Sequence, residues 1–401
     1  MKKLLFVINT LGQAGAETAL LSLLNSMDRE AYEISLYVLM GQGEMVHRLP
    51  EGVTLLNKTY QDASVLSSEG RKYIRKTVLH ALFAKGNFIR LFPYMLKNAC
   101  RMLQRGGLLA DKLLWRALSD SGMQLTQEYD LAVSYLEGGS AYYVADHVKA
   151  KKKAAFIHVD YEKAGYTRAL DKDCYLKFDR IFTVSDEVRK AFLTAYPELA
   201  DQTEIFHNIL NRDGILQRAA EGQGFSDTYD GLRILSVGRL TTQKAFEISI
   251  EAMKLLKDAG EQVRWYVLGE GDQRKKLTEK IAELGLKGDF LLPGARENPY
   301  PYMREADIYV HASRFEGKSI AIQEAQILGK PIVVSDCSGN REQVIPDVDG
   351  LMCDLSPESL CRSIQRLIRD ASFREKLGKA AAAKNQDAQS EIQKLLSILK
   401  G

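Results

Sequence analysis

Residues 308–325 read IYVHASRFEGKSIAIQEA, the most informative stretch of the chain. Its apolar start predicts a buried strand, Gly317 predicts a turn, and the remaining residues predict a helix. Ser319 suits the N-cap of that helix, because its hydroxyl can accept a hydrogen bond from a backbone N–H of the first turn. A strand, a turn and a helix N-terminus in this order offer backbone donors to an anion such as phosphate.

Two carboxylates flank this predicted anion site. Glu316 precedes the helix and Glu324 lies within it, in a Glu-x7-Glu spacing. Carboxylates do not bind phosphate directly but accept hydrogen bonds from sugar hydroxyls, so the pair indicates recognition of a polyol. The alternative is that both are solvated carboxylates near a helix end, as most Glu residues are. The spacing alone favours solvated carboxylates, whereas the further motifs of residues 236–350 favour recognition of a polyol.

Length and composition limit the possible classes of protein. The chain has 401 residues, of which 45% are apolar and 27% charged, and its net charge is +3. This length predicts two globular domains. The five cysteines form no Cys-x-x-Cys pair, so no zinc or disulfide framework is expected and a reducing cytoplasm fits. The apolar run at residues 4–8 is too short for the core of a signal peptide, and no run approaches the ~20 apolar residues of a membrane span.

An N-terminal α/β half is expected over residues 1–210, with polar residues at the ends of its strands. Gly15 and Ala16 follow the first strand at the head of a helix, and Gly lets a ligand approach the backbone closely. Glu137 and Gly138 follow another strand, and His158 follows a third. Ligands of open α/β sheets gather at the carboxyl ends of strands, so Glu137 and His158 are candidate binding residues. A structural role for the histidine is the alternative.

Residues 70–118 depart from the α/β pattern, because apolar residues alternate there with cations. The only acid of the segment is Asp111. Its cations are Arg71, Lys72, Arg75, Lys76, Lys85, Arg90, Lys97, Arg101, Arg105, Lys112 and Arg116. Basic amphipathic helices of this kind predict a surface for anionic lipid or a lipid-linked phosphate. Ordinary helices that pack their apolar face on the domain are the alternative; no nucleic-acid module is recognised.

A polar, Gly-rich connection is expected at residues 211–231, followed by a second α/β half at residues 232–375. Several motifs of this second half occur in a fixed order. They are Ser236-Val237-Gly238-Arg239-Leu240 with Lys244 five residues past Arg239, Leu268-Gly269-Glu270-Gly271, residues 306–310, Glu316-Gly317, Glu324-Ala325, residues 329–335 and Asp349-Gly350. In order and spacing they resemble the retaining glycosyltransferases of family 4, the group 1 nucleotide-sugar enzymes.

The resemblance implies an α/β fold of the GT-B type, with two Rossmann-like, doubly wound lobes that face a cleft. It implies that Arg239 and Lys244 clamp the donor diphosphate and stabilise the leaving group, and that Glu316 orients the donor sugar. His158 matches a position near the donor sugar, and Glu324 matches one at the nucleotide ribose. The expected catalytic residues are therefore Arg239, Lys244, Glu316 and His158.

The same resemblance implies the rest of the site. Residues 376–401 are expected to form a helix that crosses back to the first lobe, and Glu137 and Gly138 fall on the acceptor side. Lys318 departs from the apolar or aromatic residue common at its position, so it adds a cation or points to solvent. The further donor-binding residues are Gly15, Ala16, Gly238, Gly269, Gly271, Arg296, Gly317, Lys318 and Ser319.

The implied reaction moves a hexose-type sugar from a nucleotide diphosphate, most commonly of uridine, to an acceptor hydroxyl with retention. The departing phosphate takes the acceptor proton, so catalysis is mostly positioning and charge stabilisation. No metal or cofactor is expected, because Asp171-x-Asp173 and Asp347-x-Asp349 lack the preceding apolar strand that an Asp-x-Asp metal motif needs. A lipid-linked or polysaccharide acceptor in envelope glycan assembly is expected, with the protein in the cytoplasm at the inner face of the cell membrane.

Two alternatives stay open. One is a non-catalytic accessory subunit that binds the nucleotide sugar within a glycosylation complex. The other is a different enzyme on this fold, a sugar-nucleotide epimerase or a phosphorylase. A phosphorylase would need a lysine that holds pyridoxal phosphate, and no motif for one is recognised.

Overall fold

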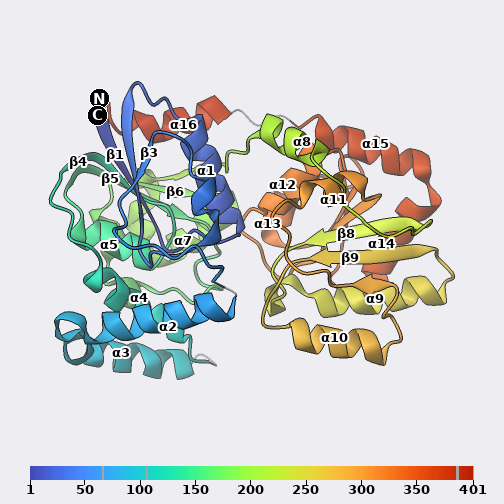
Figure 1. Cartoon of the computed structure of the whole chain (residues 1–401), viewed down its shortest axis with the longest axis horizontal. Helices are drawn as coiled ribbons and strands as arrows, with labels where there is room; N and C mark the ends of the chain where they lie inside the picture. The colour runs from blue at the N-terminus through green and yellow to red at the C-terminus, as the bar shows by residue number, and fades with distance from the viewer. Residues whose placement is uncertain (66, 105–106, 385–387, 401) are drawn as a thin grey trace. The chain divides into compact units, whose positions relative to one another are not determined.

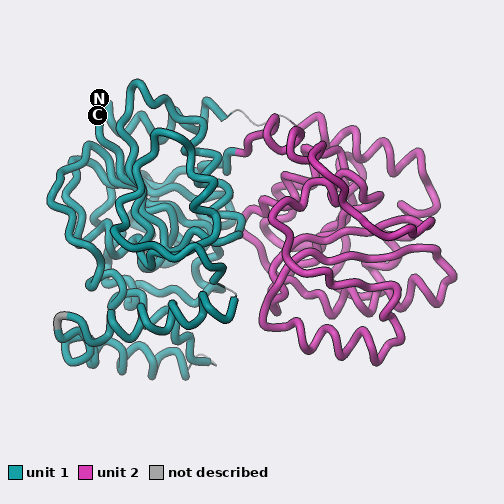
Figure 2. Tube along the Cα trace, viewed as in Figure 1, with its two compact units in different colours: residues 1–209, 387–401 teal, residues 210–386 magenta. Residues whose placement is uncertain are grey.

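The computed structural model describes residues 1–65, 67–104, 107–384 and 388–400. The chain forms two compact units (Figure 2). Unit 1 comprises Met1–Ile209 and Asp387–Gly401, and unit 2 comprises Leu210–Gln386. Each unit holds one parallel sheet with helices in its connections, as the alternating apolar runs predict (Figure 1). Arg105, one of the cations of the basic segment, lies outside the described residues.

The sheet of unit 1 has the order β3-β2-β1-β4-β5-β6-β7. Consecutive strands run outward from β1 in one direction and from β4 in the other, so the sheet is doubly wound about the β1–β4 pair. Its strands are β1 Lys2–Ile8, β2 Tyr32–Val38, β3 Val53–Leu55, β4 Tyr129–Ser134, β5 Ala150–Ile157, β6 Arg180–Thr183 and β7 Thr203–Ile205. Its helices are α1 Gly15–Ser26, α2 Ser68–Phe83, α3 Asn87–Gln104, α4 Ala110–Ser121, α5 Gly139–His147, α6 Arg168–Asp171, α7 Asp186–Ala195 and α16 Ala388–Ser397, with 3-10 turns η1 Glu44–Arg48, η2 Ala84–Gly86, η3 Cys174–Lys177 and η4 Pro197–Gln202.

The strands of unit 1 are buried on both faces, which explains their continuous apolar runs. Leu5 and Val7 of β1 share a core with Ile157 of β5 and with Val188 and Phe192 of α7. Ser185 caps the N-terminus of helix α7, because its hydroxyl accepts a hydrogen bond from the Val188 N–H at 3.2 Å.

The sheet of unit 2 has the order β10-β9-β8-β11-β12-β13 and is doubly wound about the β8–β11 pair. Its strands are β8 Leu232–Val237, β9 Val263–Leu268, β10 Phe290–Leu291, β11 Ile308–His311, β12 Ile332–Ser335 and β13 Leu351–Cys353. Its helices are α8 Arg212–Ala220, α9 Phe246–Asp258, α10 Arg274–Glu283, α11 Tyr300–Glu305, α12 Ile320–Ile327, α13 Ser338–Arg341, α14 Pro357–Arg369 and α15 Ala371–Ala382, with the 3-10 turn η5 Thr242–Lys244.

Successive residues of the unit 2 strands enter two different cores. Ile234 and Trp265 pack with α9, α10 and α14 on one face, whereas Leu235 and Tyr266 pack with α8, α11 and α12 on the other. Figure 1 shows these two groups of helices on opposite sides of the sheet. The period of two along each strand therefore divides the apolar residues between two helix layers.

The connection between the halves differs from the expected polar linker at residues 211–231. Residues 212–220 form α8, and Ile215, Ala219 and Phe225 are buried in the core of unit 2. The spacing of Ile215 and Ala219 places both on one helix face, although Gly222 and Gly224 make the surrounding sequence look irregular. The last helices also divide between the units: α15 belongs to unit 2, and α16 belongs to unit 1.

Helix α16 is tied to unit 1 by polar contacts. The Glu391 carboxylate accepts a hydrogen bond from the His207 N–H at 3.0 Å, and the Lys394 ammonium donates to the Ile205 carbonyl at 2.9 Å. Both partners lie at the end of β7, so the final helix closes this edge of unit 1. Among the described residues, no helix is both long and apolar enough to cross a membrane.

Candidate functional site

Two loops of unit 2 meet beyond the carboxyl ends of β8 and β11, the central strands of its sheet. The Gln243 side chain donates to the Phe315 carbonyl at 2.9 Å, and the Arg314 N–H donates to the Gln243 carbonyl at 2.9 Å. Ala245, which follows the turn η5, has a φ of 46°, a left-handed conformation that is uncommon for a residue with a Cβ. This turn fixes the direction of Lys244.

Lys244 contacts two polar side chains, Glu316 of the second loop and His311 at the end of β11. Its ammonium forms an ion pair with Oε1 of Glu316 and lies 3.1 Å from Nε2 of His311. The Ser313 hydroxyl donates to the same Glu316 oxygen at 2.7 Å, and His311 Nε2 lies 3.1 Å from it. All four side chains are largely buried. The structure therefore brings Lys244 and Glu316 together, two of the residues that the sequence predicts to be catalytic.

The charges of this cluster are set by burial and by the short distances. Burial raises the pKa of Glu316, but the Lys244 ammonium and the hydrogen bond with His311 outweigh it and hold that pKa below its usual range. Burial and the same ammonium lower the pKa of His311. At neutral pH the cluster thus consists of a carboxylate, an ammonium and a neutral imidazole.

The cluster leaves hydrogen-bonding capacity for a ligand. A lysine ammonium has three N–H donors, and one of them donates to Glu316. With its proton on Nε2, the neutral His311 ring donates to Glu316 and does not also accept from Lys244. Within the described residues, the contacts of Glu316 all fall on Oε1, so Oε2 can accept from a further hydroxyl. A cation donor and a carboxylate acceptor side by side suit a ligand that carries both an anionic group and hydroxyls.

Glycines bring the strand-end turns close to one another. Gly269 has a φ of 157°, and a Cβ there would lie 1.9 Å from the Gly238 carbonyl oxygen. A Cβ at Gly271 would lie 2.2 Å from the Leu240 carbonyl oxygen. Gly238 in turn lies against the side chain of Lys244, whose Cε would be 3.4 Å from an added Cβ. Gly238, Gly269 and Gly271, predicted donor-binding residues, therefore form one packed group next to Lys244.

The loop before α12 is equally tight, but its predicted cap is absent. A Cβ at Gly339 would lie 2.0 Å from the Gly317 carbonyl, so α13 packs directly on this loop. Ser319 occupies the N-cap position of α12, yet its hydroxyl makes no capping hydrogen bond among the described residues. The expectation that Ser319 satisfies a first-turn N–H is therefore corrected: its side chain leaves those N–H groups to other acceptors.

Other predicted residues of unit 2 lie outside the cluster. Glu324 is buried in α12, where its Oε1 accepts from the Tyr300 hydroxyl at 2.8 Å. Arg296 is exposed and donates to the Tyr302 hydroxyl at 3.2 Å. The side chain of Arg239 is exposed in the turn after β8, and that of Lys318 is half-buried.

A second polar group lies at the carboxyl ends of β4 and β5 in unit 1. The backbone N–H of His158 donates to Oε2 of Glu137 at 3.0 Å, so these two predicted residues are in direct contact. Burial raises the pKa of Glu137 and lowers the pKa of His158 to about 4. The imidazole is thus neutral at physiological pH. Asn9, at the end of β1, donates to the Glu137 carbonyl at 3.1 Å and joins a third strand to the group.

The remaining predicted residues of unit 1 are Gly15, Ala16 and Gly138. Gly15 and Ala16 form the first turn of α1, and Gly15 is exposed. Gly138 has a φ of 80°, and a Cβ there would approach the Trp115 ring at 3.0 Å and the Tyr166 hydroxyl at 3.1 Å. A residue other than glycine would therefore be strained at position 138 and would crowd both aromatic rings.

Three polar residues of these sites are not predicted from the sequence. His311 and Ser313 of unit 2 and Asn9 of unit 1 all lie at or just beyond the carboxyl end of a strand. The rule that selects Glu137 and His158, a polar residue at such a strand end, would also have selected His311. His311 is not selected because it lies in an apolar run of the sequence.

A family of known proteins matches the part of the chain that holds the unit 2 site. Residues 228–384 match the family described as glycosyl transferases group 1, and this range contains Lys244, His311 and Glu316. The match lies within unit 2 and covers less than half of the chain.

Relatives match over part of their length. An N-acetylgalactosamine-N,N'-diacetylbacillosaminyl-diphospho-undecaprenol 4-alpha-N-acetylgalactosaminyltransferase of Campylobacter jejuni is 33% identical over 174 residues, which are 43% of this chain and 46% of the relative. The amylovoran biosynthesis glycosyltransferase AmsK of Erwinia amylovora is 34% identical over 145 residues, 34% of this chain and 35% of the relative. The chain thus matches less than half the length of either relative.

Solved structures match over both units. Anabaena HepE in complex with UDP-glucose aligns with a TM-score of 0.70 over 100% of both chains, at 16% identity. This likeness shows the fold, two Rossmann-like α/β units of the GT-B class, and so confirms the fold class predicted from the sequence.

Proposed function

We propose that this protein is a retaining glycosyltransferase, because residues 228–384 match the family described as glycosyl transferases group 1. Its donor is a nucleotide-diphosphate sugar with uridine as the base, and its acceptor is a hydroxyl of a lipid-linked or polysaccharide glycan. One observation carries the proposal: the buried cluster of Lys244, Glu316, His311 and Ser313 at the carboxyl ends of β8 and β11.

Each group of the cluster has a role that its contacts support. An N–H of Lys244 that does not donate to Glu316 binds the donor diphosphate, together with the exposed Arg239, and both cations balance the charge that develops on it. Oε2 of Glu316 accepts from a sugar hydroxyl and so orients the ring. Glu324, Gly317, Lys318, Ser319 and Arg296 complete the donor site in this proposal, and Gly238, Gly269 and Gly271 allow its backbone turns to pack closely.

Retention follows from attack on the face that the phosphate leaves. The acceptor oxygen forms a bond to the anomeric carbon, the bond from that carbon to the phosphate oxygen breaks, and the acceptor proton passes to that oxygen. Glu316 is poorly suited to take this proton or to act as nucleophile, because its lowered pKa makes it a weak base. The fixed cations and backbone dipoles supply the stabilisation without a metal or cofactor.

The unit 1 residues complete the proposal. From the resemblance alone, we assign His158, Gly15 and Ala16 to the donor sugar and Glu137 and Gly138 to the acceptor. The name of the Campylobacter relative, which includes diphospho-undecaprenol, supports a lipid-linked acceptor. We place the reaction in envelope glycan assembly at the cytoplasmic face of the cell membrane.

A thermal-shift panel of nucleotide-diphosphate sugars tests the donor. A ligand that binds the folded state raises the unfolding midpoint by mass action, so the true donor gives a shift that grows with its concentration. E316Q should keep the shift given by UDP and lose the additional shift given by the sugar, whereas the matched surface variant E279Q should behave as wild type. The donor identified in this way is then assayed for transfer with EDTA present. A panel without any shift, or E316Q with an unchanged sugar response, contradicts the proposal.

A further inference from the structure

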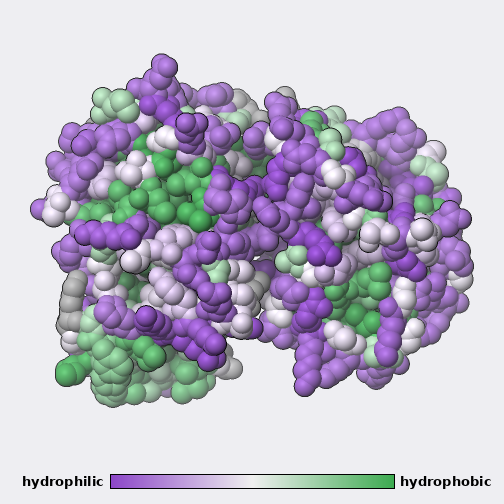
Figure 3. Space-filling model, in the orientation of Figure 1, coloured by the Kyte–Doolittle hydropathy of each residue, from purple (hydrophilic) through white to green (hydrophobic). Residues whose placement is uncertain are grey.

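The outer side of α2 and α3 exposes a row of large apolar side chains. We define this α2–α3 apolar face by seven residues that are 45–81% exposed: Leu79, Phe83, Phe88, Ile89, Phe92, Leu96 and Leu103. Figure 3 shows an apolar area at the place where Figure 1 draws α3. A contiguous patch of this kind marks an interaction surface, because scattered single residues are the norm on a soluble surface.

The side chains of this face form one surface. The rings of Phe83 and Phe88 lie with centroids 6.0 Å apart, and those of Phe88 and Phe92 are also 6.0 Å apart. Phe88, Phe92 and Leu96 follow one another at a spacing of four residues, which places them on one side of α3. The patch therefore runs from the end of α2 along α3.

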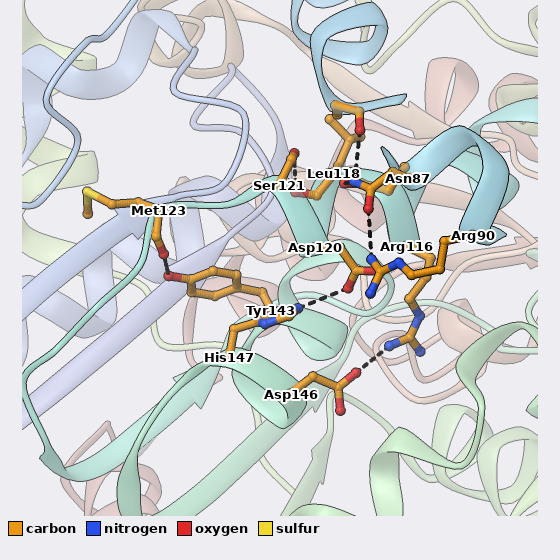
Figure 4. Close-up of polar contacts among 12 residues, drawn as sticks. Asn87, Arg90, Arg116, Leu118, Asp120, Ser121, Met123, Tyr143, Asp146 and His147 are labelled. Atoms are coloured by element: carbon orange, nitrogen blue, oxygen red, sulfur yellow. Dashed lines mark hydrogen bonds and ion pairs between the residues drawn. The ribbon is translucent and has the colours of Figure 1, made fainter. Parts of the chain in front are cut away.

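Contacts with the rest of unit 1 fix the inner side of α3, so the α2–α3 apolar face is held toward solvent. Leu91 and Met102 are buried, and the Tyr94 hydroxyl donates to the Leu170 carbonyl at 2.9 Å. Figure 4 shows the polar contacts beneath the helix: Arg90 pairs with Asp120, which also contacts His147 at 2.9 Å.

The base of α3 has further anchors. Asn87 is fully buried, and its side chain donates to the Ala81 carbonyl at 2.9 Å and accepts from Arg90 at 2.7 Å. In the neighbouring helix α4, Arg116 pairs with Asp146 and is buried, so it belongs to the interior of unit 1 rather than to a basic surface (Figure 4). Exposure of the apolar face is therefore a consequence of how the helix is fixed.

Exposed cations share helices α2 and α3 with the apolar face. Those that are exposed in α2 and α3 include Arg71, Lys72, Arg75, Lys76, Lys97 and Arg101. In the same helices the acids are limited to Glu69, whose carboxylate accepts from the Gln61 side chain at 2.8 Å. An apolar strip with flanking cations is complementary to an anionic bilayer, whose acyl region takes up the apolar side chains while its headgroups attract the cations.

We propose that the α2–α3 apolar face inserts into the headgroup–acyl boundary of an anionic lipid bilayer, with Phe83, Phe88, Ile89 and Phe92 as the inserting residues. A second copy of the chain is a poorer occupant, because a two-fold contact through this face would place the cations of one copy against those of the other. The proposal concerns unit 1 alone and does not require the donor site, so donor titration and lipid binding can fail independently.

Vesicle co-sedimentation of the full chain tests this inference. Wild type should bind vesicles of phosphatidylcholine with phosphatidylglycerol, bind phosphatidylcholine alone weakly, and lose part of its binding at high salt. F88Q/F92Q should weaken binding by at least about tenfold, since each replacement removes an apolar side chain from the lipid contact. R75Q/K76Q should weaken binding to anionic vesicles and remove much of the salt dependence.

Matched controls separate insertion from a general loss of fold. L176Q replaces an apolar residue of unit 1 that is 47% exposed outside the face, and K275Q/K276Q removes two exposed cations of unit 2. Both should bind vesicles as wild type. If F88Q/F92Q fails to fold, I89Q, at the most exposed position of the face, is tested for vesicle binding in its place. Absence of vesicle binding overturns the proposal, as does binding that F88Q/F92Q or I89Q leaves unchanged. A dimer that these substitutions dissociate, without lipid binding, would instead assign the face to a second copy.

Discussion

Lys244 and Glu316 form a buried ion pair although they are 72 positions apart in the chain. The pair joins the turn after β8 to the loop after β11, and these are the two loops at the point where the strand order of unit 2 reverses. Open parallel sheets bind their ligands at such a point. The same contact therefore holds two loops together and places a cation next to a hydrogen-bond acceptor.

Removal of the cation alone should be costly. We expect K244A to lower the free energy of unfolding by about 3–5 kcal/mol, because Glu316 is then left buried without its partner. The double variant K244A/E316Q should recover part of that loss, since a neutral amide needs no counter-charge. Denaturant unfolding of the four proteins of this cycle measures the coupling. Additive effects of the two substitutions would show that the pair contributes no coupling.

The pH dependence of stability should report on Glu316. Its pKa is lower in the folded protein than in the unfolded chain, whose value is about 4.3. The unfolded state therefore binds more protons as the pH falls below about 5, and the stabilisation from this carboxylate is present above that pH and lost on acidification. The stability difference between wild type and E316Q should be constant near neutral pH and change in favour of E316Q in acid. A difference that stays constant from pH 7 to about 3 would exclude a lowered pKa.

His158 should titrate far below an exposed histidine. Burial lowers its pKa to about 4, against about 6.5 in the unfolded chain. Between these values the unfolded state binds the extra proton, so stability should rise with pH from about 4 to about 6.5, and H158Q should remove this contribution. NMR titration of the ring protons measures the pKa directly. A midpoint for His158 near the ordinary value of about 6.5 would contradict the buried imidazole.

Gly269 should tolerate no side chain. Its φ is positive, and a Cβ would overlap the Gly238 carbonyl oxygen at 1.9 Å, so G269A must displace the turn that packs on Lys244. We expect a loss of about 2 kcal/mol or more in the free energy of unfolding. Gly288 is the matched control, because nothing lies within 4 Å of an added Cβ there and its φ is not in the left-handed region. Equal stability of G269A and G288A, measured by thermal unfolding, would contradict the close packing of these turns.

The sequence predicts most of the fold because the strands of both sheets are buried on two faces. Such strands read as continuous apolar runs, and the run at residues 4–8 lies within the observed strand β1. Helix α8 was missed because Gly222 and Gly224 follow it closely, and its few apolar residues find their partners only in the packed core of unit 2. Local composition cannot reveal that tertiary contact.

Side-chain direction limits what the sequence says about the sites. Glu316 and Lys244 can be selected from motif spacing, but their mutual contact depends on the strand order. In the basic segment, apolar residues such as Phe88 and Leu91 look alike in the sequence, although Phe88 points to solvent and Leu91 to the core. Arg116 likewise looks like a surface cation, yet it is buried against Tyr142 and Asp146. Only the fold separates these cases.

Isothermal titration with UDP tests the central claim, that Lys244 binds the donor diphosphate. Wild type should bind UDP more tightly than uridine monophosphate, because only the diphosphate extends to the ammonium. K244Q should weaken UDP binding by about tenfold or more, the effect of losing a charge-assisted hydrogen bond, while the exposed control K275Q should bind as wild type. Equal affinities of K244Q and wild type for UDP, with K244Q shown to be folded, would contradict the account.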